Sequence, residues 1–208
     1  MKKLKNKKNI IFDLDGVLID SIANMRLSWS SANIKFNLNI PFNKYQRHIG
    51  KPFEDILKSL GVDKKKFNLV KREFRSKSNK NLKKIKFYPN VKKILLYLKK
   101  KKYFIGILTS KDRLRTKLII NKLKIKFDII QCPEKPYKGK PSPDLLKKII
   151  KSKKLRRKDC IYIGDTAYDF KMCKQGKIDF IFAKYGYKIG IKDYKNKINK
   201  FSDIKKIF

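Results

Sequence analysis

The stretch NIIFDLDGVLIDS, residues 9–21, decides the fold of this chain. Residues 9–14 form a short apolar run that ends in acids, which is typical of a buried strand stopping at a turn. Asp13 and Asp15 are two positions apart, so their side chains project to the same side of an extended chain. Gly16 then lets the backbone turn sharply. The stretch predicts a first strand with a polar site at its carboxyl end.

Downstream of residue 87, short apolar runs alternate with helical patterns. Strands are predicted at 103–108, 127–130, 160–163 and 179–182. Helices are predicted at 91–98, 113–123, 143–151 and 169–175, with one more short helix near the end of the chain. Strands separated by helices predict an α/β fold with a parallel, doubly wound sheet.

Between the first strand and this region, residues 21–86 have a helical character and contain no convincing strand. Apolar side chains recur at three- and four-residue spacing from Phe53 to Leu60, and Gly61 ends that helix. We therefore expect one α/β catalytic core that is interrupted early by an all-helical cap domain. The expected bounds are 1–18 and 87–208 for the core and 19–86 for the cap.

The composition is strongly basic, with 57 Lys+Arg against 17 Asp+Glu and a formal net charge of +40. Only 8 of the basic residues are Arg and 49 are Lys, whereas reading of bases and phosphates favours Arg. The lysines are spread along the chain, and Ile (28) and Asn (14) are abundant too. These three residue types share A/T-rich codons, so a biased genome explains the composition better than a dedicated nucleic-acid surface, which stays open as the alternative.

Membrane and secreted classes fit the sequence poorly. No apolar run reaches the roughly 18 residues of a membrane span, and Asp13 and Asp15 interrupt the apolar stretch that follows the basic start. The three cysteines, Cys132, Cys160 and Cys173, have no CxxC spacing, which argues against a disulfide framework and a zinc site. We expect a cytoplasmic protein with no membrane association.

Polar residues also follow other predicted strands. Thr109 and Ser110 come after the second strand, where hydroxyls near the start of a helix suit phosphate oxygens. Lys140 lies in the loop GKPSP, held between a glycine and prolines, and Asp165 and Asp169 follow the fourth strand. Ligands of open parallel sheets bind at the carboxyl ends of the strands, so we expect all these residues in one site.

Each of these residues alone also fits a structural role. Thr109, Asp165 and Asp169 resemble ordinary helix caps, and Lys140 is one lysine among 49. An EF-hand is excluded because Asn24 stands where the loop needs its final Glu. Either Asp pattern arises by chance in roughly 4% of chains of this composition. Their occurrence together at strand ends is far rarer, so the constellation predicts function although its parts do not.

The sequence resembles the haloacid dehalogenase-like hydrolase superfamily, in the branch with a helical cap after the first strand. Phosphoglycolate phosphatase-like and β-phosphoglucomutase-like members are the nearest. The resemblance spans residues 9–187 and implies a Rossmann-like core. It rests on FDLDGVLIDS (12–21), FYPNVKKILLYLKKK (87–101), LTSKDR (108–113), GKPSPD (139–144) and IGDTAYDF (163–170).

The resemblance implies catalytic roles. Asp13 would be the nucleophile that forms an aspartyl-phosphate, and Asp15 would be the general acid/base that protonates the leaving oxygen and later takes a proton from water. Thr109 and Lys140 would bind the transferring phosphoryl group, with Ser110 as a further phosphate contact.

The same resemblance implies a magnesium site. Asp165 and the Asp13 carboxylate would bind Mg²⁺ together with the Asp15 backbone carbonyl, and Asp169 would ligate it directly or through water. An all-oxygen donor set favours Mg²⁺ over zinc. A cation is also needed on physical grounds, because a carboxylate that attacks a phosphate dianion meets strong repulsion.

We therefore expect a Mg²⁺-dependent phosphatase that hydrolyses a small phosphorylated metabolite. A sugar-phosphate mutase or a pyrophosphatase of the same family would share these residues and stays open. The alternative of another class is a nucleic-acid-binding protein, or a phosphatase of polynucleotide ends, that uses the lysine-rich surface. His48, in the predicted cap, is open between a substrate contact and a packing role.

Overall fold

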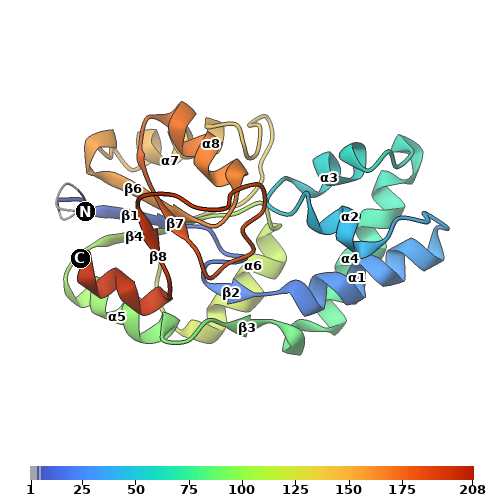
Figure 1. The fold of residues 1–208 in the computed structure, drawn as a ribbon, viewed down its shortest axis with the longest axis horizontal. Coiled ribbons are helices and arrows are strands. Elements are labelled where there is room, and N and C mark those ends of the chain that lie inside the picture. The colour runs from blue at the N-terminus through green and yellow to red at the C-terminus, as the bar shows by residue number, and fades with distance from the viewer. Residues whose placement is uncertain (1–3, 5) are drawn as a thin grey trace.

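An open sheet of six parallel strands forms the centre of the structure, a computed structural model that describes residue 4 and residues 6–208 (Figure 1). The strand order is β5-β4-β1-β6-β7-β8. Their bounds are β1 (Asn9–Phe12), β4 (Phe104–Leu108), β5 (Ile129–Gln131), β6 (Cys160–Gly164), β7 (Asp179–Ala183) and β8 (Lys197–Ile198). The predicted α/β fold with a doubly wound parallel sheet is confirmed.

The first strand lies at the point where the strand order reverses. β1 pairs in parallel with β4 on one side and with β6 on the other. Its residues Ile10, Ile11 and Phe12 are fully buried, because helices cover both faces of a parallel sheet. The crevice beyond this strand is where open α/β sheets bind their ligands, and Asp13 is the first residue to enter it.

Helices cover both faces of the sheet (Figure 1). One face carries α5 (Val91–Lys100), α6 (Arg113–Ile120) and the 3₁₀ helix η6 (Phe201–Lys206). The other carries α7 (Asp144–Ser152) and α8 (Ala167–Gly176). Short 3₁₀ turns complete the connections: η2 (Lys64–Lys66), η3 (Leu82–Lys84), η4 (Asn121–Leu123) and η5 (Arg157–Asp159).

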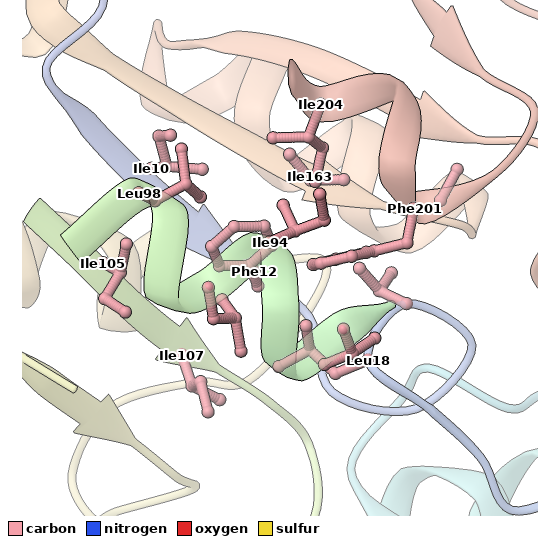
Figure 2. Close-up of a cluster of buried hydrophobic side chains, with 14 of the residues drawn as sticks. Ile10, Phe12, Leu18, Ile94, Leu98, Ile105, Ile107, Ile163, Phe201 and Ile204 are labelled. Carbon is pink, nitrogen blue, oxygen red and sulfur yellow. The ribbon is translucent and has the colours of Figure 1, made fainter. Parts of the chain in front are cut away.

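The apolar layer under α5 fixes the position of β1 (Figure 2). Ile94 and Leu98 lie one turn apart on α5, and both are buried in the same cluster as Phe12. Phe12 also packs on Phe201 with 5.8 Å between ring centroids. Burial of one such side chain contributes about 1.5–3 kcal/mol, so the strand that carries Asp13 is held firmly.

The helical insertion has a hydrophobic core of its own. It consists of α1 (Ile22–Lys35), α2 (Phe42–Gln46), α3 (Phe53–Ser59) and α4 (Phe67–Lys80). Tyr45 stacks on Trp29 with 4.7 Å between ring centroids, and Phe74 joins the same buried cluster. This cluster is distinct from the two clusters that flank the sheet.

A small antiparallel ribbon connects the insertion to the sheet. β2 (Ile19–Asp20) pairs with β3 (Lys86–Phe87), so the chain leaves and re-enters at adjacent places (Figure 1). We propose the domain division 1–18 and 87–208 for the core and 19–86 for the cap, because both crossings pass through this ribbon.

The structure differs from the sequence prediction in several details. β1 ends at Phe12 and not at residue 14, since Leu14 begins a turn in which its carbonyl accepts from the amides of Leu18 and Ile19. α8 begins at Ala167 and not at residue 169. β2, β3 and β8 were not predicted, and the last helix is a 3₁₀ helix. None of the helices in the described part of the chain is long and apolar enough to cross a membrane.

Candidate active site

The residues predicted from four separate segments meet at one edge of the sheet. Asp13 directly follows β1, Thr109 directly follows β4, and Asp165 directly follows β6. Lys140 reaches the same place from the loop before α7, and Asp169 from the first turn of α8. The parallel strands put their carboxyl ends side by side, which explains the convergence.

Three buried carboxylates form the centre of the site. Asp13, Asp165 and Asp169 are at most 4% exposed, and each offers an oxygen within 4.8 Å of the others. Lys140 Nζ lies 2.8 Å from Asp13 Oδ1 and 2.8 Å from Asp169 Oδ1. If all four groups are ionised, three negative charges face one positive charge.

Asp165 is enclosed by backbone. Its Oδ2 accepts a 2.7 Å hydrogen bond from the Tyr187 amide, while its buried Oδ1 has no partner among the described residues. A Cβ on Gly16, whose φ is +82°, would lie 2.0 Å from Asp165 Oδ2, and one on Gly186 would lie 2.3 Å from the Gly16 carbonyl. Gly16 and Gly186 therefore let the backbone pack closely around the Asp165 carboxylate, whose Oδ1 has no hydrogen-bond partner among the described residues.

Asp169 caps helix α8 and also belongs to the carboxylate cluster of the site. Its Oδ2 accepts from the Thr166 hydroxyl at 2.7 Å and from the Thr166 amide at 3.1 Å, which makes a capping box at the start of α8. Its Oδ1 faces Lys140 and accepts from the Tyr162 hydroxyl at 3.3 Å. Asp169 is therefore a helix cap, as the sequence allowed. The cap fixes the carboxylate so that Oδ1 faces the cluster.

Burial shifts the pKa values of the central groups. It raises the pKa of Asp13 to about 7, although the nearby Lys140 acts in the opposite direction. Burial also raises the pKa of Asp165, and the charges of Asp169 and Asp13 add to that effect. For Lys140, burial alone would lower the pKa, but the carboxylates of Asp13 and Asp169 outweigh it and raise the pKa above its ordinary value.

The donor set fits a divalent cation bound by oxygen. The cluster offers carboxylate oxygens only, which Mg²⁺ prefers. The charge excess of the three carboxylates over Lys140 is two, which one divalent ion would balance. The buried, unpartnered Asp165 Oδ1 is the kind of atom that such an ion satisfies.

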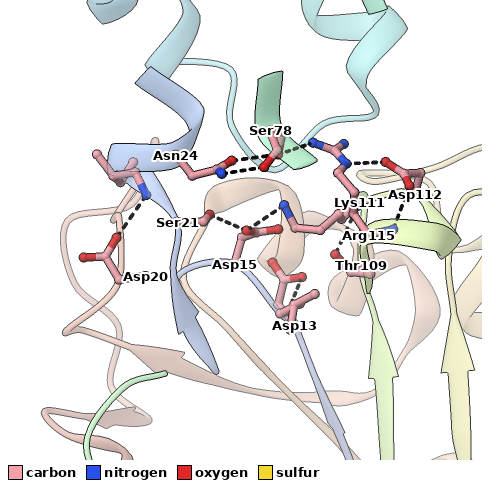
Figure 3. Close-up of polar contacts among 12 residues, drawn as sticks. Asp13, Asp15, Asp20, Ser21, Asn24, Ser78, Thr109, Lys111, Asp112 and Arg115 are labelled. Atoms are coloured by element: carbon pink, nitrogen blue, oxygen red, sulfur yellow. Dashed lines mark hydrogen bonds and ion pairs between the residues drawn. The ribbon is translucent and has the colours of Figure 1, made fainter. Parts of the chain in front are cut away.

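Asp15 lies outside this cluster, with its own partners (Figure 3). Its Oδ1 accepts from the Ser21 hydroxyl and lies 3.1 Å from Lys111 Nζ. Ser21 is also linked to Tyr187, whose hydroxyl accepts from the Ser21 amide at 2.8 Å. The carboxylate is thus fixed by one residue at the start of the cap and one from the core.

The two hydroxyls after β4 have different partners. Thr109 is 2% exposed and its Oγ1 accepts from the Lys111 amide at 3.1 Å. Ser110 donates its hydroxyl to the Gly50 carbonyl of the cap at 2.7 Å. Ser110 therefore joins core and cap in this structure.

A cavity of about 50 Å³ lies between cap and core. Its core side carries Asp13, Asp15, Thr109 and Ser110, four of the residues predicted from the sequence. Cap side chains, among them Tyr45, close it from the opposite side. The site is therefore a partly enclosed pocket between core and cap.

Sequence reasoning assigned no site role to most of the residues that line this pocket, among them Lys111, Arg115 and Tyr45. Lys111 and Arg115 line it from the core and are 7% and 6% exposed, and Tyr45 lines it from the cap at 3%. The only available signal was that Lys111 directly follows Thr109 and Ser110. His48 is outside the described lining of this cavity, and its buried Nδ1 has no hydrogen-bond partner in the described part of the chain.

The chain is similar to known proteins over most of its length. The family model for haloacid dehalogenase-like hydrolases matches residues 10–183. A β-phosphoglucomutase of Bacillus subtilis is 30% identical over 174 residues, which covers 76% of this chain and 75% of that protein. A phosphoglycolate phosphatase of Nitrosococcus oceani is 23% identical over 201 residues, with 90% and 88% covered.

A pyrophosphatase of Bacillus cereus is 28% identical over 168 residues, with 77% of this chain and 75% of that protein covered. The crystal structure of a hydrolase from Pseudomonas syringae has the same fold, with a TM-score of 0.85, 22% identity, and coverage of 96% of this chain and 97% of that one. Since the family model spans most of the chain, this chain belongs to the haloacid dehalogenase-like hydrolase family and is an enzyme of it.

Proposed function

We propose that this hydrolase is a Mg²⁺-dependent phosphatase that acts on a small phosphorylated metabolite through an aspartyl-phosphate. The observation that carries the proposal is the cluster of three buried carboxylates with one lysine, in which Asp13 also lines the pocket between core and cap. Perturbed, buried acids of this kind gather at catalytic sites. Asp13, Asp165 and Asp169 would hold Mg²⁺ together with the backbone carbonyl of Asp15, and the bound ion would offset the negative charge of the phosphate.

The first half of the reaction is attack by an Asp13 carboxylate oxygen on the phosphorus. The phosphoryl group moves to Asp13 while the bond to the leaving oxygen breaks. Asp15 gives that oxygen its proton, and Lys140 and Thr109 bind the phosphoryl oxygens. Lys140 supports this assignment because its ammonium group is buried 2.8 Å from Asp13 Oδ1, so it meets the phosphoryl group where the new bond forms.

In the second half, water attacks the phosphorus of the aspartyl-phosphate and Asp15 takes the proton of that water. The bond between phosphorus and the Asp13 oxygen breaks, which releases inorganic phosphate and restores the carboxylate. Covalent catalysis of this type divides one difficult displacement into two easier steps. The contacts of Asp15 with Ser21 and Lys111 hold its carboxyl group in place through both steps.

The size of the cavity supports a small substrate. One water molecule needs about 10–15 Å³ of such space, so 50 Å³ accommodates a phosphoryl group and a few further atoms. The end of a polynucleotide would require a wide exit, whereas the cap side chains Tyr45, Phe53 and Phe74 line the cavity opposite the core. We therefore favour a metabolite over a nucleic-acid substrate.

Similarity to two of the relatives leaves two other reactions open for the same site. A β-phosphoglucomutase and a pyrophosphatase are both similar to this chain over three quarters of its length. A mutase would give isomerised product without free phosphate, and a pyrophosphatase would prefer pyrophosphate to phosphomonoesters. A preference for pyrophosphate is visible as phosphate release in the test of the proposal, and isomerised product is detected by analysing the sugar phosphates of the same incubations.

The test is phosphate release from a panel of small phosphomonoesters and pyrophosphate, with Mg²⁺ or with EDTA. We expect release that depends on Mg²⁺ and falls by at least about 10³-fold in Asp13→Asn, because the nucleophile is removed. Asp193→Asn is the matched control, since this aspartate is exposed and the same chemical change there should leave the rate unchanged. Undiminished activity of Asp13→Asn would refute the mechanism.

A further inference from the structure

Tyr187, in the loop after β7, contacts both halves of the proposed catalytic machinery. Its backbone amide donates to Asp165 Oδ2 at 2.7 Å, and its hydroxyl lies against Ser21, which bonds to Asp15. We propose that Tyr187 is a positioning residue that acts through Ser21 to hold the Asp15 carboxyl group where it protonates the leaving oxygen. The inference rests on the proposed function, because it assigns a further residue to the first half of that reaction.

Ser21 is the middle member of this chain of contacts. It is fully buried and directly precedes α1, at the position where a serine side chain ordinarily accepts from an amide of the first turn. Its hydroxyl makes no such cap bond and donates to Asp15 Oδ1 instead (Figure 3). The neighbouring Asp20 accepts from the Ile22 amide at 3.0 Å in its place. The serine is therefore directed toward the acid/base and not toward the helix.

The directions of these hydrogen bonds follow from the number of protons. A serine hydroxyl has one proton, and Ser21 uses it on Asp15. The Tyr187 hydroxyl lies 3.1 Å from Ser21 Oγ, so it is the donor of that contact, and it accepts from the Ser21 amide at 2.8 Å. One phenol thus fixes both the main chain and the side chain of Ser21. Hydrogen bonds in such a chain polarise one another, which strengthens the bond to Asp15.

The loop that carries Tyr187 is held firmly against both domains. Tyr187 and Ile189 are partly buried and pack against the hydrophobic cluster of the cap. The Ile189 carbonyl accepts from the Ala167 amide at 2.8 Å, which ties the loop to the start of α8. Gly186 lies so close to Gly16 that a Cβ on it would be 2.3 Å from the Gly16 carbonyl. The loop therefore places the phenol in a defined position beside Ser21.

Tyr187 thereby connects the carboxylate cluster with the acid/base. Its backbone fixes Asp165, and its phenol fixes, through Ser21, the group that protonates the leaving oxygen. A general acid has to lie within hydrogen-bond reach of the oxygen that it protonates. Lys111 Nζ lies 3.1 Å from the same Asp15 Oδ1. Without Ser21 and Tyr187, the lysine alone would therefore determine the direction of the carboxyl group.

A matched pair of esters tests this role. Phenyl phosphate and 4-nitrophenyl phosphate share the same ring, but phenolate is a basic leaving group that needs a proton, whereas nitrophenolate leaves readily without one. The value of kcat/KM reports the reaction only up to transfer of the phosphoryl group to Asp13, so the later use of Asp15 as a base does not enter. A misplaced acid should therefore lower kcat/KM for phenyl phosphate and spare 4-nitrophenyl phosphate.

Tyr187→Phe keeps the ring and the backbone amide and removes only the hydroxyl. We expect kcat/KM to fall about 5- to 10-fold for phenyl phosphate and less than about twofold for 4-nitrophenyl phosphate, as for one lost hydrogen bond. Tyr185→Phe is the matched control, because Tyr185 lies in the same loop and its hydroxyl donates to the Val17 carbonyl at 2.9 Å instead of to Ser21. This control should change kcat/KM for either ester by less than about twofold.

Ser21→Ala tests whether Tyr187 acts through the serine. This variant removes the contact with Asp15 itself, so we expect the same selectivity between the two esters with a larger loss, about 10- to 100-fold for phenyl phosphate. When Tyr187→Phe is added to Ser21→Ala, no further loss should follow, because the connection to Asp15 is already broken. Losses that multiply in the double variant would overturn the positioning role. An equal loss for both esters in Tyr187→Phe would overturn it as well, since a merely structural contact has that effect.

Hydrogen exchange of the Ser21 amide gives a readout without turnover. This amide donates to the Tyr187 hydroxyl, so its exchange, followed by NMR, should be about 5- to 10-fold faster in Tyr187→Phe and unchanged in Tyr185→Phe. Unchanged exchange in Tyr187→Phe would overturn the role. A wild-type protein that releases phosphate from no ester refutes the proposed function and this role with it. An active wild-type protein whose Tyr187→Phe variant treats both esters alike refutes the positioning role alone.

Discussion

Replacement of Asp13 by Asn should stabilise the metal-free protein, and the gain should grow with pH. The Asp13 carboxyl is buried beside Asp165 and Asp169, and its pKa is raised from 3.8 to about 7. In the unfolded chain the same group loses its proton near pH 3.8. Between these values the folded state binds more protons than the unfolded state, so the free energy of unfolding falls as pH rises.

The size of this effect follows from the shift in pKa. One pKa unit corresponds to about 1.36 kcal/mol, so a shift of about three units costs the folded state about 4 kcal/mol once Asp13 is fully ionised. Asn at this position does not titrate and avoids the loss. From pH 5 to pH 8, the stability of Asp13→Asn relative to the wild-type protein should therefore rise by about 3 kcal/mol.

Urea unfolding in EDTA at pH 5 and pH 8 measures this difference directly. Asp193→Asn is again the matched control, because its exposed carboxylate has a lowered pKa and gives no such gain over this pH range. Saturating Mg²⁺ should reduce the dependence on pH, since the ion stabilises the ionised cluster. A stability difference between Asp13→Asn and wild type that stays constant from pH 5 to pH 8 would refute the assignment of a raised pKa to Asp13.

Three further changes test the surroundings of the site. Gly16→Ala should destabilise the protein by about 3 kcal/mol or more in urea unfolding, because its φ of +82° and the neighbouring Asp165 leave no room for a Cβ. Asp165→Asn should abolish the rise in melting temperature with Mg²⁺, which corresponds to about 2.7 kcal/mol in the wild-type protein at 100 times Kd; an unchanged rise would place the ion elsewhere. Ser110→Ala removes the bond to the Gly50 carbonyl and should lower kcat/KM about fivefold, as expected for one hydrogen bond; a loss of 10³-fold would instead make Ser110 a direct contact of the transition state.

The parts of the fold that periodicity controls were predictable from the sequence. The five long strands and the helices between them are apolar on the faces that they bury, as in α5, where Val91, Ile94, Leu95 and Leu98 are buried. The position of the first acids was predictable as well, because a buried strand must end where charged residues begin. Leu14 shows the limit, since it is buried and apolar and yet belongs to the turn.

The missed features depend on tertiary contacts. β8 has two residues, which is too short for any periodicity, and it forms only because β7 offers a free edge. The burial of Lys111 and Arg115 has no local signal in a chain with 49 lysines, since it depends on how distant parts of the chain pack around the pocket. Tyr45 likewise follows the aromatic pattern of a helical core, and only the structure places it at the cavity.

Burial of three acids close together is unfavourable for the stability of the fold. This cost is evidence that the acids have a function. Apolar side chains of similar size in place of Asp13, Asp165 and Asp169 would avoid the cost of burying like charges, and buried ion clusters of this kind are often less stable than such replacements. The chain has only 17 acids among 208 residues, and it places three of them together where each raises the cost of the next. Buried acids with raised pKa values gather at functional sites, so a costly cluster of this kind supports the proposed divalent-ion site and its chemistry.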